Sequence, residues 1–420
     1  MPDYKKKKVR RVGRSSGKAR VSHDIPMQSA DKRRKPSSES GIKVVKGNKL
    51  ERRRRFKILV ASAVFVATVI VVMSFILPVG LVENISNVMA TIGVGEYPYE
   101  IYGSEILNTV SRGNYYYILT DTNIVASTNS GKNIYAHPHG FSKPVLSASH
   151  TRALIYDQGG TDVNVFNLSK QVNSAQVDGT VITACIARSG HFAVAYEADT
   201  YASTVDVFDK RGRKIFTWNS ARDLVTGITL SPSGKKLAVA TIGVSAGKYT
   251  SSVLVFGYDS ADPLFSKEYP DDNILNLESV SSRGFSVLTS NKYSFVSWRK
   301  YTVTDTDNEL EPAMYRNVSS GALVVYNRSG DRGDNRIIVL SKKGEKISEV
   351  DFDGIISDIT YAHGHIYCIS DTNVYMLDKE GNIMRTAECE YGGNRIAVTG
   401  TYSVAVVYSG KVQRVDLKGE

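Results

Sequence analysis

Two pairs of histidines are the residues in this 420-residue sequence whose spacing most suggests chemistry. His137 and His139 are separated by one residue, and so are His363 and His365. On a β-strand, side chains two positions apart point to the same face, so each pair offers two imidazoles to a metal ion. Two ligands make a weak site, and the repeat described below puts the pairs on opposite faces. We therefore expect no metal to bind here.

Other motifs are weaker still. Acidic residues alternate at Asp305, Asp307, Glu309 and Glu311, but the glycine and the ligand order of a calcium loop are missing. The adhesion tripeptide Arg-Gly-Asp at 332–334 is typical of an ordinary turn. We find no Gly-x-Ser-x-Gly elbow and no phosphate loop. The sequence predicts no catalytic residue, no cofactor and no metal.

The three cysteines, Cys185, Cys368 and Cys389, all fall in apolar strand patterns. Cys368 and Cys389 are predicted in the second and fourth strands of one unit. Strands are ~4.8 Å apart, so these residues would be ~9–10 Å apart, too far for a disulfide. We expect three buried free thiols.

These residues belong to a repeating pattern of short β-strands. In LSPSGKKLAVATIGV, residues 230–244, two apolar runs flank the turn Ser-Pro-Ser-Gly. Similar units recur about every 41 residues to the end of the chain. The units start near Ile106, Val145, Val181, Val225, Ile274, Asn317, Ile356 and Asn394. A period of ~40–45 residues with four strands per unit is typical of a β-propeller.

The repeat predicts an all-β propeller of about eight four-stranded blades. Seven is the alternative, because the units near 274 and 317 are irregular and could share one sheet. The last unit shows only three strands, and the extended segment 97–103 (YPYEIYG) precedes the first unit. We expect this segment to complete the last blade, which would remove exposed sheet edges. The innermost strands TACIA, TGITL and NLESV carry Glu278 as their only charge, which argues against an enzyme in the channel.

The N-terminal region differs sharply in charge from the rest. Residues 1–57 contain 21 Lys and Arg against five acids, whereas the remaining 363 residues contain 32 and 37. Residues 58–77 carry no charge and are long enough to span a bilayer as a helix. The bases before them predict a cytoplasmic N-terminus. A cleaved signal peptide is the alternative, although both its expected regions would be unusually long.

The predicted organisation has four parts. They are a disordered basic cytoplasmic segment (1–57), a transmembrane helix (58–80), a linker (81–95) and an extracytoplasmic propeller (96–420). The basic segment could contact anionic lipid head groups, and no motif predicts nucleic-acid binding. This predicts a single-pass protein of the cell membrane.

The segments HGFSKPVL, RALIYDQGG and TLSPSGKKLAVATIGV…SSVLVF resemble an uncharacterised family of single-pass membrane proteins from Gram-positive anaerobes. The resemblance covers about residues 90–417 and implies a propeller outside a cytoplasmic membrane, without any assigned activity. The blades are also similar to WD-type and quinoprotein-like repeats. The closing Trp-Asp dipeptide is absent, and two tryptophans are too few for the docking residues of a quinoprotein. No quinone cofactor is therefore expected.

Loop length suggests where a partner binds. The segments 197–203, 243–252 and 327–336, together with an excursion at 298–316, are predicted to emerge on one face, opposite clipped turns such as 231–234. Tyrosine, tryptophan and arginine dominate binding hot spots. The candidates on this face are Tyr201, Tyr249, Trp298, Arg299, Tyr315, Arg332 and Arg336.

The predicted function is that of a membrane-tethered, non-enzymatic binding or scaffold module for an envelope protein, peptide or glycan. The alternatives are an exported hydrolase or quinoprotein-like enzyme working in the channel, and a sensor coupled to the basic segment. An enzyme would need several carboxylates or histidines at corresponding innermost-strand positions.

Overall fold

The structure, a computed structural model, describes residues 49–76, 79–245, 247–308, 310–318, 320–330 and 332–417. The chain divides into two units, Met1–Val71 and Val72–Glu420. Most of the predicted basic segment, residues 1–48, lies outside the described residues.

Two helices precede the strands. Helix α1 (Lys49–Ile76) includes the last nine residues of the basic segment, and α2 (Val79–Thr91) occupies most of the predicted linker. Within the described part of the chain, no helix combines the length and apolar character needed to cross a bilayer. Residues 77 and 78 of the predicted spanning segment are outside the described residues.

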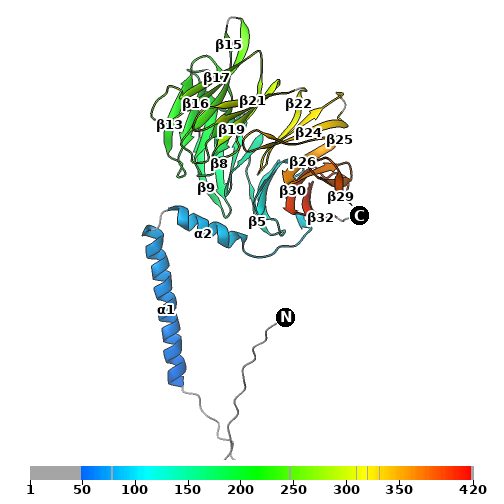
Figure 1. The fold of residues 1–420 in the computed structure, drawn as a ribbon. Coiled ribbons are helices and arrows are strands. Elements are labelled where there is room, and N and C mark those ends of the chain that lie inside the picture. Colours follow the sequence, from blue (N-terminus) through cyan, green and yellow to red (C-terminus); the bar gives the residue numbers. More distant parts are fainter. Residues whose placement is uncertain are drawn as a thin grey trace, which may run out of the picture. The chain divides into compact units, whose positions relative to one another are not determined.

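The second unit contains eight antiparallel four-stranded sheets, which are the blades of a propeller (Figure 1). Blade 1 consists of β2 (Ile106–Arg112), β3 (Tyr115–Thr120), β4 (Asn123–Thr128) and β5 (Asn133–Pro138). Blade 2 consists of β6 (Pro144–Ala148), β7 (Arg152–Asp157), β8 (Asp162–Asn167) and β9 (Gln171–Gln176). Blade 3 consists of β10 (Thr180–Ile186), β11 (Phe192–Glu197), β12 (Ser203–Phe208) and β13 (Lys214–Ser220). Blade 4 consists of β14 (Leu224–Leu230), β15 (Leu237–Ser245), β16 (Lys248–Phe256) and β17 (Phe265–Pro270).

The second half of the ring repeats this order. Blade 5 consists of β18 (Ile274–Ser279), β19 (Gly284–Thr289), β20 (Lys292–Ser297) and β21 (Val303–Asp307). Blade 6 consists of β22 (Pro312–Val318), β23 (Gly321–Asn327), β24 (Asp334–Ser341) and β25 (Lys346–Asp353). Blade 7 consists of β26 (Ile356–Ala362), β27 (His365–Ser370), β28 (Asn373–Leu377) and β29 (Ile383–Glu388). Blade 8 consists of β30 (Arg395–Gly400), β31 (Ser403–Tyr408), β32 (Lys411–Asp416) and β1 (Tyr99–Glu100).

The predicted eight blades and their closure are confirmed. Strand β1 pairs with β32 through Tyr99–Val412 and Glu100–Lys411, so the N-terminal end of the propeller completes the last blade. The irregular units at 274 and 317 form two separate sheets rather than one.

Burial follows the position of each strand in its blade. The second strands are almost fully buried, as in β11, because each blade is covered by a neighbour on both faces. This explains their continuous apolar sequences, such as FAVAY. The outer strands alternate between partly buried and exposed residues, as in β13. The core therefore lies between blades: Ala193 and Val205 of blade 3 belong to one cluster with Ile228 and Val239 of blade 4.

The strand order defines two faces of the ring. We call the loop face the one that carries the second-to-third-strand connections and the blade-to-blade connections. We call the turn face the one that carries the first-to-second and third-to-fourth connections. Bonds between blades follow this division: the Gly159 amide donates to the Val181 carbonyl on the loop face, and the Ser189 amide donates to the Pro232 carbonyl on the turn face.

Candidate binding face

A projecting hairpin distinguishes the loop face, but the predicted difference in connection length is wrong: connections between strands span two to six residues on this face and two to eight on the turn face. Strands β15 and β16 extend to nine residues each and form a hairpin that projects beyond the other blades (Figure 1). Val244, near its tip, is 77% exposed. Segment 243–252, predicted as a loop, is mostly paired strand. The predicted loops 197–203 and 327–336 are shorter than expected, because Glu197, Ser203, Asn327 and residues 334–336 belong to strands.

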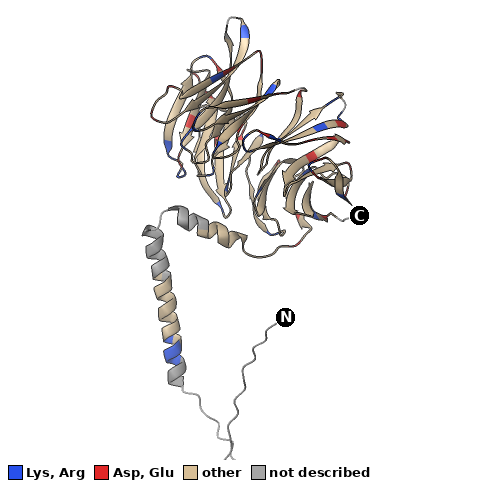
Figure 2. Ribbon diagram, in the orientation of Figure 1, with Lys and Arg blue, Asp and Glu red and all other residues tan. Residues whose placement is uncertain are grey.

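The two faces differ in charge. Among described residues in the connections of the loop face, ten are acidic and four are basic. The acids are Glu105, Asp121, Asp178, Asp199, Asp223, Asp271, Asp272, Glu311, Asp371 and Glu390, and the bases are Lys143, Arg222, Arg328 and Arg332. Figure 2 shows how the charges of both signs are distributed over the ribbon.

The turn face has the opposite balance. Its described connections hold fourteen basic and six acidic residues. The bases are Lys132, Lys170, Arg188, Lys210, Arg211, Arg213, Lys235, Lys236, Arg283, Arg299, Lys300, Lys342, Lys343 and Lys379, and the acids are Asp209, Asp259, Asp262, Glu345, Asp378 and Glu380. The propeller sequence is mildly acidic as a whole, but its connections are mostly acidic on the loop face and mostly basic on the turn face.

Four of the seven predicted partner-binding residues lie on or next to the loop face. Tyr201 is exposed in the β11–β12 loop and Arg332 in the β23–β24 loop. Tyr249 is exposed on β16, in a strand rather than a loop. Arg336 lies on β24 and pairs with Glu349 and Asp351, at 3.5 and 3.2 Å.

The structure places the other three predicted residues elsewhere. Trp298 and Arg299 belong to the β20–β21 turn and therefore to the turn face. Trp298 is 3% exposed and packs against Phe285 with the two rings tilted by 45°. Tyr315 lies on the innermost strand β22, where its hydroxyl is 2.7 Å from Ser286 Oγ and burial raises its pKa well above the ordinary value. The excursion 298–316 is not one loop, because β21 and most of β22 lie within it.

Sequence reasoning missed a group of exposed apolar side chains on the loop face. Tyr391 is 89% exposed, and Tyr102 and Ile355 are also exposed in blade-to-blade connections. Leu224 and Leu275 are exposed where innermost strands begin. Because those strands start at the loop face, these leucines lie at the mouth of the channel. The sequence feature that could have identified these two leucines is an apolar residue at the start of an innermost strand.

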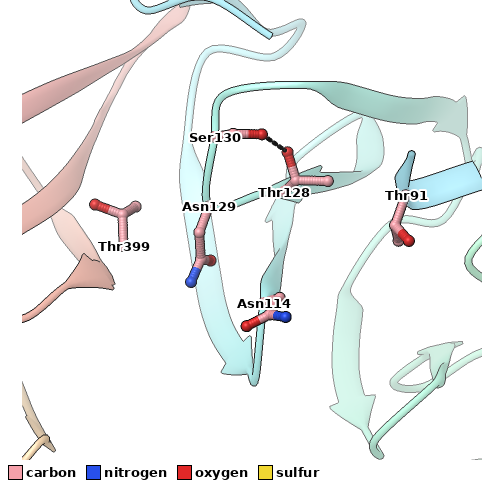
Figure 3. Close-up of a pocket in the computed structure, with 6 residues that line it drawn as sticks. All are labelled: Thr91, Asn114, Thr128, Asn129, Ser130 and Thr399. Atoms are coloured by element: carbon pink, nitrogen blue, oxygen red, sulfur yellow. Dashed lines mark hydrogen bonds between the residues drawn. The ribbon is translucent and has the colours of Figure 1, made fainter. Parts of the chain in front are cut away.

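Two shallow cavities mark the two faces. One, of about 350 Å³, opens on the loop face between blades 1 and 2. Its lining residues are Glu105, Leu107, Asp121, Ser142, Lys143, Pro144, Val145 and Gln158. The other, of about 300 Å³, lies on the turn face and is drawn in Figure 3. Thr91 at the end of α2 lines one side of it, and the other lining residues include Thr128 and Ser130, whose hydroxyls are 2.8 Å apart.

The channel is more highly charged than the sequence predicted. Besides Glu278 on β18, the innermost strands carry Arg112, Arg316, Asp358 and Arg395. Glu278 is the only charge of the three innermost strands named from the sequence, but four further charges lie on β2, β22, β26 and β30.

These channel groups bond to their neighbours. Arg316 pairs with Asp358, and Arg316 Nη1 reaches Asn108 Oδ1 of blade 1 at 3.4 Å. Arg112 donates to the Ala148 carbonyl at 2.8 and 3.1 Å. Burial raises the pKa of Glu278, while Arg112 and Arg316 act in the opposite direction. The network joins several blades across the channel.

The histidine pairs lie on opposite faces as predicted, but the cysteine prediction is only partly correct: Cys368 is buried, whereas Cys185 and Cys389 are partly buried and Cys389 follows β29. His139 follows β5 on the loop face, and its two ring nitrogens bond to the Thr120 carbonyl and the Phe141 amide. His363 lies in a turn on the opposite face. Across the described residues, no group of three or more His, Cys, Asp or Glu side chains could hold a metal. All three cysteines are free, and burial raises the pKa of the Cys185 thiol to about 12.

Eight radial four-stranded sheets with a charged channel define an eight-bladed β-propeller. The chain belongs to a family of unknown function, DUF5711, whose model matches residues 99–417. No curated protein matches the sequence.

Solved structures show the same fold at low identity. BamB from Moraxella catarrhalis is similar with a TM-score of 0.50 and 10% identity, over 77% of this chain and 99% of that chain. The C-terminal WD40 domain of Sif2 is similar with a TM-score of 0.51 and 11% identity, over 78% of this chain and all of that chain. Likeness at this level concerns the fold alone.

Proposed function

We propose that this protein is a membrane-tethered, extracytoplasmic binding module that holds an envelope protein, peptide or glycan on its loop face, without catalysis. The observation that carries the proposal is the asymmetry of the ring. One face combines the projecting β15–β16 hairpin, four exposed tyrosines and apolar residues at the channel mouth, whereas Tyr402 is the one exposed tyrosine among the described residues of the other face.

The tether rests on the sequence. Residues 58–77 contain no charged residue, and Arg52 to Arg55 and Lys57 precede them directly. By the positive-inside rule this arrangement places the N-terminus in the cytoplasm and the propeller outside. In an extracytoplasmic location the loop face is accessible to components of the envelope.

The charge of the loop face supports a basic partner. Its acids attract cationic groups over a distance comparable to the Debye length, ~8 Å at physiological ionic strength, and increase the rate of encounter. Tyr201, Tyr249 and Tyr391 supply exposed aromatic area, the usual source of affinity in the centre of an interface. The partner chemistry we propose is therefore a Lys- or Arg-rich segment or an amino-substituted glycan.

Alanine substitutions at Tyr201, Tyr249 and Tyr391 test the proposal. Truncating one hot-spot residue costs roughly 2 kcal/mol, or about thirtyfold in affinity. We expect the triple variant to lose capture of the partner identified by crosslinking in cells, with its melting temperature nearly unchanged.

The matched control uses exposed residues of the turn face. Arg299, Lys343 and Tyr402 changed together to alanine should leave capture within a few-fold of the wild type. If this set abolishes capture and the tyrosine set does not, the loop face is not the binding face.

The charged channel favours a second candidate, an exported enzyme. Glu278 is an acid whose pKa is raised by burial, as in many general acids. Capture that survives Glu278→Gln supports the binding module. If the wild-type protein converts an envelope substrate and the Glu278→Gln variant does not, the result would support the enzyme.

A further inference from the structure

Helix α2 is attached to the turn face through polar groups. Ser86 Oγ lies 3.0 Å from Ser169 Oγ, and the Leu168 amide donates to Asn87 Oδ1 at 3.2 Å. Lys132 Nζ donates to the Ala90 carbonyl at 2.8 Å and also to the Ile92 carbonyl. A cation at a helix C-terminus complements the helix dipole. The turns of blades 1 and 2 thus fix α2 from its middle to its end.

The side of α2 that faces away from the propeller is apolar. Ile85, Val88 and Met89, followed by Ile92 just beyond the helix, have the i, i+3, i+4, i+7 spacing of one helical stripe. They are 53, 60, 67 and 66% exposed. Asn87, on the opposite side, is buried against blade 2.

This amphipathicity is the reverse of that of an ordinary surface helix. A helix on a protein in water turns its apolar stripe to the core and its polar side to solvent. In α2 the polar side contacts the propeller and the apolar stripe is left uncovered. We therefore expect the uncovered stripe of α2 to contact an apolar environment.

Two features indicate that these surroundings are a lipid bilayer. Helix α2 begins at Val79, two residues after the uncharged segment 58–77 ends. The turn face to which α2 is bound holds fourteen bases and six acids among its described connections, which complements anionic head groups. Interfacial helices combine an apolar stripe with Lys and Arg on their polar face; α2 has the stripe but no base of its own, and the bases of the neighbouring turns supply the positive charge.

We propose that α2 lies in the bilayer interface with Ile85, Val88, Met89 and Ile92 among the acyl chains, and that it holds the turn face towards anionic lipid and the loop face away from it. The proposal rests on the membrane tether of the proposed function. It adds that the propeller has a fixed orientation instead of swinging freely on its anchor.

Spin labelling of the full chain tests this. Met89→Cys and Val244→Cys variants are labelled with a nitroxide and reconstituted in nanodiscs of phosphatidylcholine and phosphatidylglycerol, with labelled wild type as the blank for the three native cysteines. Oxygen concentrates in acyl chains, whereas a nickel chelate stays in water. We expect the ratio of oxygen to nickel accessibility to be several-fold higher at residue 89 than at residue 244.

The outcomes separate the possible occupants of the stripe. Equal ratios at residues 89 and 244, in protein that resists carbonate extraction, would overturn the interfacial position while leaving the tether intact. A label at residue 89 that is sheltered from both reagents would indicate contact with protein, such as a second copy, and would also overturn it. Extraction of the whole chain by carbonate would overturn the tether, and this inference with it. Val88→Cys repeats the test if Met89→Cys disturbs folding.

Discussion

Asp358 connects three consecutive blades through its two carboxylate oxygens. One oxygen pairs with Arg316 of blade 6, and the other accepts the Ile396 amide of blade 8 at 2.9 Å. The Asp358 side chain is 3% exposed and Ile396 is buried, whereas the Arg316 side chain is 25% exposed, so removing the carboxylate leaves a buried amide and a partly buried guanidinium without this partner. Polar groups in this channel therefore contribute to the closure of the ring.

Replacing Asp358 by alanine should strongly destabilise the propeller. Breaking a buried ion pair by removing one partner costs about 3–5 kcal/mol, and we expect the lower end of this range because Arg316 is partly exposed and keeps its contact with Asn108. Asp351→Ala is the control, since its pairs with Arg328 and Arg336 are on the surface and worth about 0–1 kcal/mol. Chemical denaturation measures both, and equal losses would contradict the structural role of Asp358.

Glu278 gives a prediction of pH dependence. Its folded-state pKa is raised by burial above the ordinary value near 4.5, so the folded state holds the proton more tightly than the unfolded chain. The resulting stability is fully present below pH 4.5 and is lost as the pH rises through the raised pKa. Glu278→Gln removes this loss.

The free energy of unfolding of Glu278→Gln relative to wild type should therefore increase between pH 4 and pH 8. Denaturation at the two pH values measures the change. A variant that becomes less stable relative to wild type as the pH rises would show that Arg112 and Arg316 favour the ionised form more than burial disfavours it.

The charged residues of the channel are the ones whose contacts were hardest to predict from the sequence. The strand pattern indicated which residues are near the channel, but a pairing such as Arg316 with Asp358 depends on how far each innermost strand is shifted along the axis. Trp298 was misassigned because the polar strand β21, VTDTD, resembles a loop and made the turn before it look like part of an excursion.

Single elements were predicted more securely than residues. The alternation of turn residues and apolar runs predicted the hairpins. The missing fourth strand of the last unit predicted that segment 97–103 closes the ring. The β15–β16 hairpin was read as a loop because Gly243, Ser245 and Gly247 interrupt its apolar pattern, although cross-strand pairing continues to Ser245–Lys248.

Deleting residues 97–103 should destabilise the ring by several kcal/mol. The deletion exposes the edge of β32 and removes the hydroxyls of Tyr97 and Tyr99, which lie 3.0 and 2.8 Å from that of the fully buried Tyr116. Each buried polar group left unpaired costs about 1–3 kcal/mol. The melting temperature of the deletion variant measures the effect.

The control for the deletion is Tyr102→Ala, which removes an exposed side chain from the same segment and should change the melting temperature little. If the deletion variant melts at the temperature of the wild type, pairing of β1 with β32 does not stabilise the ring.

On the scale of the whole molecule, the repeat period predicted the fold, and the family match supports no activity. The opposite charges of the two faces were not predictable from the sequence, because they depend on which connection lies on which face. That assignment needed the strand bounds, because one misplaced strand transfers every later connection to the other side. The orientation of the propeller on a membrane is proposed from α2 and this polarity together.

The most direct measurement is photo-crosslinking in intact cells from one residue on each face. A photoreactive phenylalanine analogue replaces Tyr249 on the loop face or Tyr402 on the turn face, both exposed tyrosines. We predict adducts to an envelope protein, peptide or glycan from position 249, and adducts to lipid from position 402. Envelope adducts from position 402, with lipid adducts from position 249, would contradict both the binding face and the orientation.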